Sequence, residues 1–147
     1  MTISVLMPNI APEEMSGNPI HVVVGVVFDA DGKVLITRRP EHVHQGGLWE
    51  FPGGKVESGE GVRSALVREL QEELGIEIIA AQSFLQVRYA YPDKLVLLDV
   101  WWVRSYKGRA RGAEGQAVDW LEPEALYRRS FPAANHPIIE AICHHKV

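Results

Sequence analysis

Apolar residues recur along the chain in short runs separated by turn residues, and one longer stretch follows a helical period. Five runs are rich in Val, Ile and Leu or alternate with polar residues, which predicts strands. They lie at residues 20–28, 34–37, 76–91, 95–104 and 118–121. The segment from Asp29 to Gly32 is a turn signal, so the first two runs are expected to form a β-hairpin. Residues 38–54 hold Pro and Gly without a period and predict a long loop.

The segment from Gly61 to Leu74 predicts a helix, because it lacks Pro, is rich in good helix formers and is followed by Gly75, a residue suited to the left-handed end of a helix. Residues 122–129 and 137–145 also have a helical pattern. Together the elements predict one domain over residues 20–147, a mixed β-sheet with helices packed against it. Residues 1–19 have no periodicity and predict a loose, poorly ordered arm.

Charge and length narrow the functional classes. The chain has 147 residues, a formal net charge of −4 and a pI near 5.8, which argues against a surface that binds duplex nucleic acid. An anionic substrate would need bound cations or a few aimed arginines. The apolar run near the N-terminus is too short for a signal peptide or membrane span, so a cytoplasmic monomer without membrane contact is expected. Cys143 is the single cysteine, which excludes an internal disulfide and favours a small packed side chain.

Three glutamates mark the predicted helix. At about 100° per residue, Leu66, Leu70 and Leu74 form one stripe, and Glu69, Glu72 and Glu73 cluster along its edge. Like charges at these spacings destabilise a helix, and a bound cation would remove the repulsion. An oxygen-only ligand set suits Mg²⁺ or Mn²⁺, which also binds phosphate oxygens. The alternative is an ordinary solvated helix face, and this trio alone leaves both interpretations open.

The spacing around this helix resembles the Nudix box, G-x5-E-x7-R-E-U-x-E-E-x-G-U, where U is a bulky aliphatic residue. All nine specified positions are occupied within 23 residues: Gly54, Glu60, Arg68, Glu69, Leu70, Glu72, Glu73, Gly75 and Ile76. The resemblance implies an α+β fold, an α/β/α sandwich with a mixed β-sheet flanked by helices.

The same resemblance assigns roles at the site. It implies that Glu60 ties the preceding loop to the helix, and that Glu69 is the general base held by Arg68. The implied ligands of Mg²⁺ (Mn²⁺ being the other candidate) are Glu69, Glu72, Glu73, the carbonyl of Gly53 and, as a further metal or water ligand, Glu114. Read alone, Glu114 is an exposed turn residue.

Outside the box, the chain is similar to the MutT-type 8-oxo-dGTP diphosphatases. The similarity lies in Thr37–Arg39, Leu48–Lys55, Tyr91–Asp93, Glu114–Gln116 and Phe131–Asn135. It implies that Asn135 reads the oxidised base, that the Glu50–Gly53 stretch lines the pocket and that Asp93 contributes to it. The implied substrate-binding residues are Arg39, His44, Glu50, Phe51, Pro52, Gly53, Asp93 and Asn135. Lys94 departs from the arginine that is common in this family.

Several of these residues have structural alternatives. An asparagine shortly before Pro137 can cap a helix, and Phe51 and Trp49 read alone are core residues. His44 alone is a loop histidine, and Arg39 a surface charge at a strand end.

The resemblance implies hydrolysis of 8-oxo-dGTP at the β phosphorus, which yields the monophosphate and pyrophosphate and avoids mutation by cleaning the nucleotide pool. Gly47–Phe51 is shared with Nudix enzymes that act on pyrimidine nucleotides such as CTP and dCTP, and these are the nearest alternative. A non-catalytic nucleotide-binding Nudix domain is the alternative from another class, which the intact glutamate set argues against.

Overall fold

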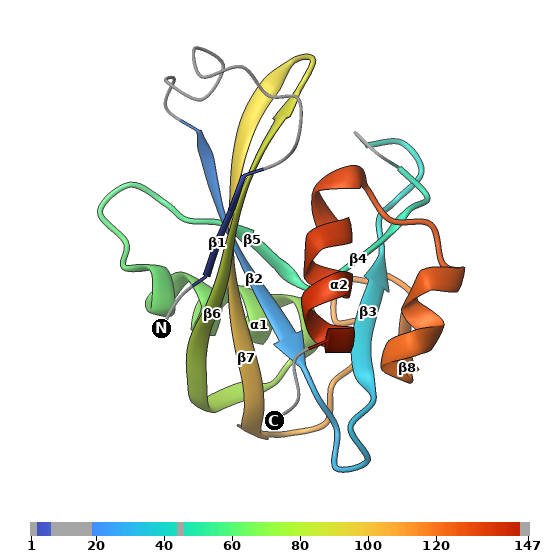
Figure 1. Ribbon diagram of the computed structural model, residues 1–147. Helices are drawn as coiled ribbons and strands as arrows, with labels where there is room; N and C mark the ends of the chain where they lie inside the picture. Colours follow the sequence, from blue (N-terminus) through green and yellow to red (C-terminus); the bar gives the residue numbers. More distant parts are fainter. Residues whose placement is uncertain (1–2, 7–18, 44–45, 145–147) are drawn as a thin grey trace.

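The described residues of the computed structural model are 3–6, 19–43 and 46–144, and they form two β-sheets with helices on both sides (Figure 1). The larger sheet has the strand order β1-β6-β7-β2-β5, and the smaller one has the order β4-β3-β8. The strands are β1 (Ile3–Leu6), β2 (Ile20–Val27), β3 (Val34–Arg38), β4 (Trp49–Glu50), β5 (Gly53–Lys55), β6 (Glu77–Tyr91), β7 (Lys94–Lys107) and β8 (Val118–Leu121). The larger sheet is mixed, because β2 runs parallel to β7 and antiparallel to β5.

Alternate residues of β2 feed two separate cores. Val23 and Val27 pack with the buried leucines of helix α1 (Val62–Leu74), whereas Val24 and Val26 pack with Ile138 and its neighbours in helix α2 (His136–His144). This is the period of a strand that is covered on both faces. Two 3₁₀ segments, η2 (Pro123–Arg128) and η3 (Ala133–Asn135), precede α2. The predicted α+β fold with a mixed sheet between helices is confirmed.

The predicted hairpin between residues 20–28 and 34–37 is wrong. Both strands exist, and Asp29 closes the turn by accepting hydrogen bonds from the backbone N–H groups of Asp31 and Lys33. However, only an isolated bridge between Phe28 and Val34 joins them, and β2 and β3 belong to different sheets. Along its length β2 pairs with β7, and over Val22–Val24 also with β5, whereas β3 leaves the turn to pair with β4 and β8.

Other expectations need smaller corrections. The predicted loop at 38–54 contains the short strands β4 and β5, and residues 123–128 form a 3₁₀ rather than an α-helix. Within the predicted loose arm, Ile3–Leu6 forms β1, which pairs in parallel with β6, while residues 1–2 and 7–18 lie outside the described residues. His145 of the last predicted helix also lies outside them.

The described residues include no helix with the length and apolarity needed to cross a bilayer. Cys143 packs at the edge of the α2 core, and its Sγ lies 3.4 Å from the carbonyl oxygen of Pro123. Burial raises the pKa of the Cys143 thiol, which disfavours a nucleophilic thiolate.

Candidate active site

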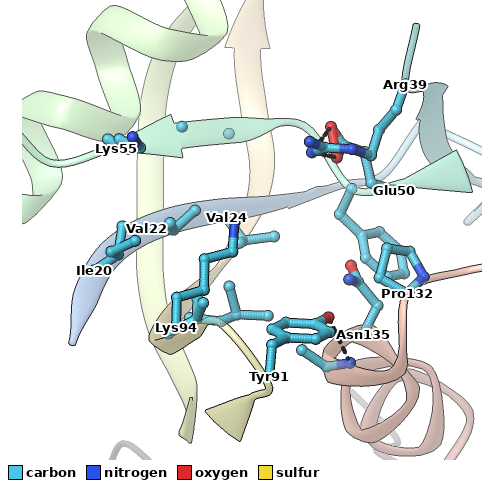
Figure 2. Close-up of a pocket in the computed structure, with 16 residues that line it drawn as sticks. Ile20, Val22, Val24, Arg39, Glu50, Lys55, Tyr91, Lys94, Pro132 and Asn135 are labelled. Atoms are coloured by element: carbon cyan, nitrogen blue, oxygen red, sulfur yellow. Dashed lines mark hydrogen bonds and ion pairs between the residues drawn. The ribbon is translucent and has the colours of Figure 1, made fainter. Parts of the chain in front are cut away.

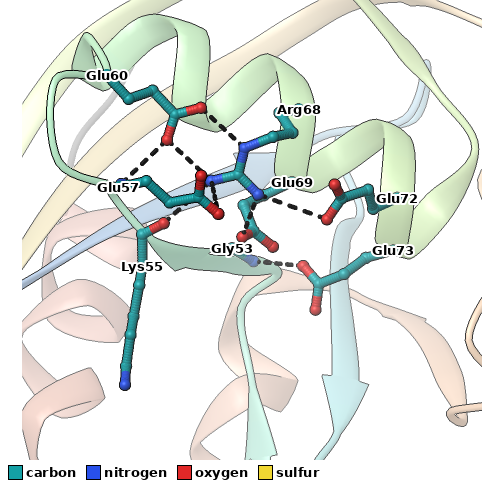
Figure 3. A network of polar contacts seen from close by, with 8 residues as sticks. All are labelled: Gly53, Lys55, Glu57, Glu60, Arg68, Glu69, Glu72 and Glu73. Atoms are coloured by element: carbon teal, nitrogen blue, oxygen red, sulfur yellow. Dashed lines mark hydrogen bonds and ion pairs between the residues drawn. The ribbon is translucent and has the colours of Figure 1, made fainter.

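Helix α1 presents its glutamates because its opposite face is tied into the core. Ala65, Leu66, Leu70 and Leu74 are buried at the helical spacing of the predicted stripe. The helix ends at Gly75, whose left-handed backbone (φ 71°) lets its N–H bond the carbonyl of Gln71. With these anchors the side chains of Glu69, Glu72 and Glu73 point toward β5 (Figure 3).

Arg68 is the centre of the polar network on this face (Figure 3). Its Nε and Nη2 bind the two carboxylate oxygens of Glu60 at 2.8 and 2.9 Å, and its Nη1 binds Glu69 Oε1 at 2.9 Å. It also donates to the carbonyl of Lys55 and lies 3.5 Å from Glu72 Oε2. One guanidinium thereby connects the loop, β5 and α1.

Glu60 acts from the loop rather than from the helix. Its Oε1 accepts the backbone N–H of Glu57, and its two oxygens accept the fork of Arg68. The hydrogen bonds from Arg68, followed by the one from Glu57, lower the pKa of Glu60 to about 2. Glu60 therefore stays ionised and holds the loop against α1 throughout the physiological range.

The carboxyl groups of Glu69 and Glu73 have raised pKa values. Burial is the largest cause that raises the pKa of Glu69; the Arg68 hydrogen bond opposes it, and repulsion from Glu72 and Glu114 adds to it. Burial likewise raises the pKa of Glu73 to about 8, against a hydrogen bond of 2.7 Å from the Gly53 N–H and together with repulsion from Glu50, Glu69 and Glu114. A divalent cation would favour the ionised form of both residues.

The donor set fits a hard cation. Carboxylates are the available ligands, and they approach β5 so closely that a Cβ on Gly54 would overlap the Glu69 carboxyl group. Within the described part of the chain, no three carboxylate, imidazole or thiol side chains stand in a ready-made metal-binding cluster. In this structure Glu69 is paired with Arg68, and Glu73 with the Gly53 amide. To bind a cation, Glu69 and Glu73 would have to exchange these partners for it.

A pocket lies on the other side of β5 (Figure 2). Five of the predicted substrate-binding residues line it: Arg39, Glu50, Phe51, Gly53 and Asn135. Pro52 does not, because it is buried with its carbonyl bonded to the N–H of Gly25. Asp93 is exposed in the turn between β6 and β7 and does not line the pocket either. His44 lies outside the described residues.

Asn135 lies at the inner wall of this pocket, at the end of η3, and only 9% of its surface is exposed. Its backbone N–H binds the carbonyl of Pro132, whereas its side-chain amide makes no hydrogen bond to any residue that the structure describes. The amide therefore does not cap α2, which was the structural alternative for this residue. An amide that opens onto a pocket and has no partner among the described residues is suited to a ligand that supplies a donor and an acceptor.

Arg39 and Glu50 form an ion pair of 2.8 Å at the pocket wall. Strands β3 and β4 pair antiparallel beside them, which brings the two side chains together. Burial raises the pKa of Glu50, while the hydrogen bond and the charge of Arg39 oppose the shift. The charge of Glu50 also adds to the rise in the pKa of Glu73. The Arg39–Glu50 pair therefore borders the pocket and is also close enough to influence the carboxylates of α1.

Phe51 and Trp49, which read alone are core residues, both pack in or against the α2-side core. Phe51 is buried and stacks on Phe131 with ring centroids 5.3 Å apart, so it is a core residue with one edge at the pocket. Trp49 lies outside the pocket lining, and its ring lies under the guanidinium of Arg129 at 4.8 Å.

Several pocket residues were not predicted. Tyr91 contributes its ring and accepts a hydrogen bond of 3.3 Å from the N–H of Ala134, and Lys94 extends along the aliphatic floor (Figure 2). The floor itself comes from alternate residues of two parallel strands: Ile20, Val22, Val24, Val96 and Leu98. Their strand alternation was visible in the sequence, but which face would border a ligand depends on the packing of η3.

Comparison with known proteins gives the family. The NUDIX domain family model matches residues 23–141. The chain is 38% identical to the 8-oxo-dGTP diphosphatase of Escherichia coli K12, over 82% of this chain and 93% of that protein. It is 40% identical to the CTP pyrophosphohydrolase of the same organism, over 81% of this chain and 88% of that protein.

Solved structures of similar proteins support the same family. A MutT structure from a study of the Aliivibrio salmonicida and Vibrio cholerae proteins superposes with a TM-score of 0.73 at 34% identity, over 86% of this chain and 98% of that one. The solution structure of the E. coli ORF135 protein gives a TM-score of 0.77 at 38% identity, over 88% and 91% of the two chains. With an intact Nudix box on α1 and β5, this chain belongs to the Nudix hydrolase family.

Proposed function

We propose that this Nudix hydrolase is a Mg²⁺-dependent diphosphatase that cleaves 8-oxo-dGTP to the monophosphate and pyrophosphate. The observation that carries the proposal is the side-chain amide of Asn135, which has no partner among the described residues and lines a pocket separated from the α1 carboxylates by β5. Mn²⁺ is the other metal that the donor set suits.

The residues on α1 have two roles in hydrolysis, as proton acceptor and as metal ligands. Glu69, held at 2.9 Å by Arg68, accepts the proton of the attacking water. Water adds to the β phosphorus, the bond from that phosphorus to the α–β bridging oxygen breaks, and pyrophosphate and the monophosphate leave. Glu69, Glu72, Glu73, the Gly53 carbonyl and Glu114 would hold the cation, which would neutralise the diphosphate and make its phosphorus more electrophilic.

The pocket selects the base. Oxidation at C8 of guanine leaves a hydrogen on N7, so that N7–H becomes a donor next to the O6 acceptor. A single primary amide such as Asn135 matches this pair, because its oxygen accepts from N7–H and its nitrogen donates to O6. Unmodified guanine offers two acceptors on the same edge and leaves the amide oxygen facing a lone pair.

CTP hydrolysis is the second candidate. It is supported by the 40% identity to the CTP pyrophosphohydrolase, which is as high as the identity to the 8-oxo-dGTP diphosphatase. The cytosine edge also carries a donor and an acceptor, at N4 and N3, so an asparagine amide alone does not exclude it.

A substrate panel with product identification separates the candidates. Purified protein with Mg²⁺ is incubated with 8-oxo-dGTP, dGTP, CTP, dCTP and 5-methyl-dCTP, and the products are identified by chromatography. The expected result is rapid release of 8-oxo-dGMP with pyrophosphate and slow turnover of the others. Preference for a cytosine nucleotide would replace the proposed substrate, and release of orthophosphate would show that the β–γ linkage is cleaved instead of the α–β linkage.

A further inference from the structure

The segment between β7 and β8 is docked on the C-terminal end of α1. The N–H of Arg111 bonds the carbonyl of Leu74 at 3.0 Å, and the N–H of Ala113 bonds the carbonyl of Glu73 at 2.9 Å. Carbonyl groups in the last turn of a helix have no partner within the helix, so an outside segment that supplies donors is held in place by them. The segment that carries Glu114 is therefore attached to the turn that carries Glu72 and Glu73.

Gln116 completes this attachment with its side chain. Its Nε2 donates to the carbonyl of Glu73 at 2.9 Å, and its Oε1 accepts the backbone N–H of Glu114, also at 2.9 Å. The two partners dictate the orientation of the amide, because a carbonyl requires the NH₂ group and an N–H requires the oxygen. Glu73 and Glu114 are thus joined by one primary amide.

The backbone around Gln116 is itself fixed. The carbonyl of the next residue, Ala117, accepts the N–H of Arg38 at the end of β3. A Cβ on Gly112 would overlap the carbonyl of Gln116, so the turn between them is tightly closed. Gln116 is held from the sheet side and reaches toward α1.

A position of Glu114 near the α1 carboxylates is electrostatically unfavourable without a cation. Glu114 adds to the repulsion that raises the pKa of both Glu69 and Glu73, so its carboxylate lies within their electrostatic range. Glu114 is exposed, and a free loop would let it turn toward solvent. The hydrogen bonds of Gln116 oppose that movement, and a cation between the carboxylates would turn the repulsion into attraction.

We propose that Gln116 is a positioning residue that keeps Glu114 beside the carboxylates of α1 and thereby increases the affinity of the protein for a divalent cation. The inference rests on the metal-binding part of the proposed function and is independent of which base the pocket selects. Gln116 touches neither substrate nor cation and acts through Glu114.

The test substitutes Gln116→Met, which keeps the length and the neutral charge of the side chain and removes both hydrogen bonds. Mg²⁺ binding is measured by titration calorimetry without nucleotide. Because a net hydrogen bond contributes on the order of 1 kcal/mol, the dissociation constant is expected to rise roughly three- to tenfold. Gln82→Met is the matched control, since Gln82 is an exposed residue of β6 that lies opposite Trp102 of β7, and its Mg²⁺ affinity should equal that of the unsubstituted protein.

A double-mutant cycle separates positioning from general loosening of the fold. In a Glu114→Gln background, Gln116→Met should weaken Mg²⁺ binding by less than about twofold, because the carboxylate that it positions is gone. An unchanged Mg²⁺ affinity of the single variant, or an equal loss in both backgrounds, would overturn the proposal.

A measurement on the unsubstituted protein covers the case in which Gln116→Met does not fold. The backbone N–H of Glu114 should be protected from hydrogen exchange, and saturating Mg²⁺ should increase that protection. An amide that exchanges as fast as an open loop, with or without Mg²⁺, would contradict the positioning role. Nucleotide enters none of these measurements, so a wrong base assignment and a wrong role for Gln116 give different results.

Discussion

Two neighbouring regions, the carboxylate face of α1 and the pocket beyond β5, differ in how they are built. On α1, Arg68 engages Glu60, Glu69, Glu72 and the carbonyl of Lys55, so nearly every polar group has a partner. The pocket instead has an aliphatic floor and, in its wall, the amide of Asn135, which has no partner among the described residues. The first region consists of paired charges, and the second is a largely apolar pocket with one amide that a ligand could reach.

The two regions also differ in how much of the chain they need. The carboxylate face comes mainly from the 23 residues from Gly54 to Ile76, whereas the pocket joins residues of β2, β4, β5, β6, β7 and η3. The reaction and the base preference can therefore change independently, which agrees with relatives of similar identity that carry different substrates in their names. Four substitutions or conditions test this separation, beginning with the largest expected effect.

Replacing Glu69 by Gln should abolish most of the turnover. The substitution keeps the hydrogen bond to Arg68 possible but removes the proton acceptor, so kcat is expected to fall by about 10²–10⁴. Nucleotide binding, measured with 8-oxo-dGMP by calorimetry, should stay within a fewfold of the unsubstituted protein. A variant with unchanged kcat would remove Glu69 from the mechanism.

Replacing Asn135 by Ala should reduce selectivity more than it reduces catalysis. Loss of a bidentate base contact costs about 1–3 kcal/mol, so the ratio of kcat/KM between 8-oxo-dGTP and dGTP is expected to fall by roughly 5- to 150-fold. The kcat for dGTP should change little, because the α1 network is intact. Glu140→Gln, on the exposed side of α2, is the control. An unaltered ratio would contradict base reading by Asn135.

Replacing Arg68 by Lys should weaken the reaction without affecting selectivity. A lysine ammonium cannot bind both oxygens of Glu60 and also reach Glu69 and the Lys55 carbonyl, so the loop and the base lose their common support. We expect kcat to fall by about tenfold with the nucleotide preference preserved. A change in preference would show that the two regions are coupled.

The stability of the metal-free protein should depend on pH through Glu73. Its pKa is raised from the ordinary value of 4.5 to about 8, so its contribution to stability is fully present below 4.5 and is lost as pH rises to about 8. Mg²⁺ favours the ionised carboxylate, so the increase in Tm that it causes should grow over the same range. Thermal unfolding at pH 5–8 with and without Mg²⁺ measures this effect, which should amount to a few degrees. Glu73→Gln is the comparison, and an identical pH dependence in that variant would exclude Glu73 as the source.

Sequence reasoning succeeded where interactions are local. The helix predicted at 61–74 is α1 at Val62–Leu74, and Gly75 ends it in the left-handed conformation, because period, helix formers and the end signal all lie within one segment. The predicted hairpin failed because the partners of β2 come from β5 and β7. Strands of two or three residues such as β4 and β5 are too short to show a period, so they read as loop.

The same distinction holds at the site. The glutamates could be located from their spacing, and the structure places them on one side of β5. The approach of Tyr91 and Lys94 to η3 could not be predicted, since residues such as Tyr91 and Ala134, 43 positions apart, meet only after the chain has folded. Asp93, expected near the base, is exposed in its turn, while its neighbour Lys94 lines the pocket.

The most direct test of the account is a competition for the enzyme within one reaction. Equal concentrations of 8-oxo-dGTP, dGTP and CTP are mixed with Mg²⁺ and protein, and the disappearance of each nucleotide is followed by chromatography, which gives the ratios of kcat/KM directly. The account predicts that 8-oxo-dGTP is consumed first, by a factor of roughly 10² or more over both competitors, and that pyrophosphate accumulates with 8-oxo-dGMP. Consumption of CTP ahead of 8-oxo-dGTP would contradict it.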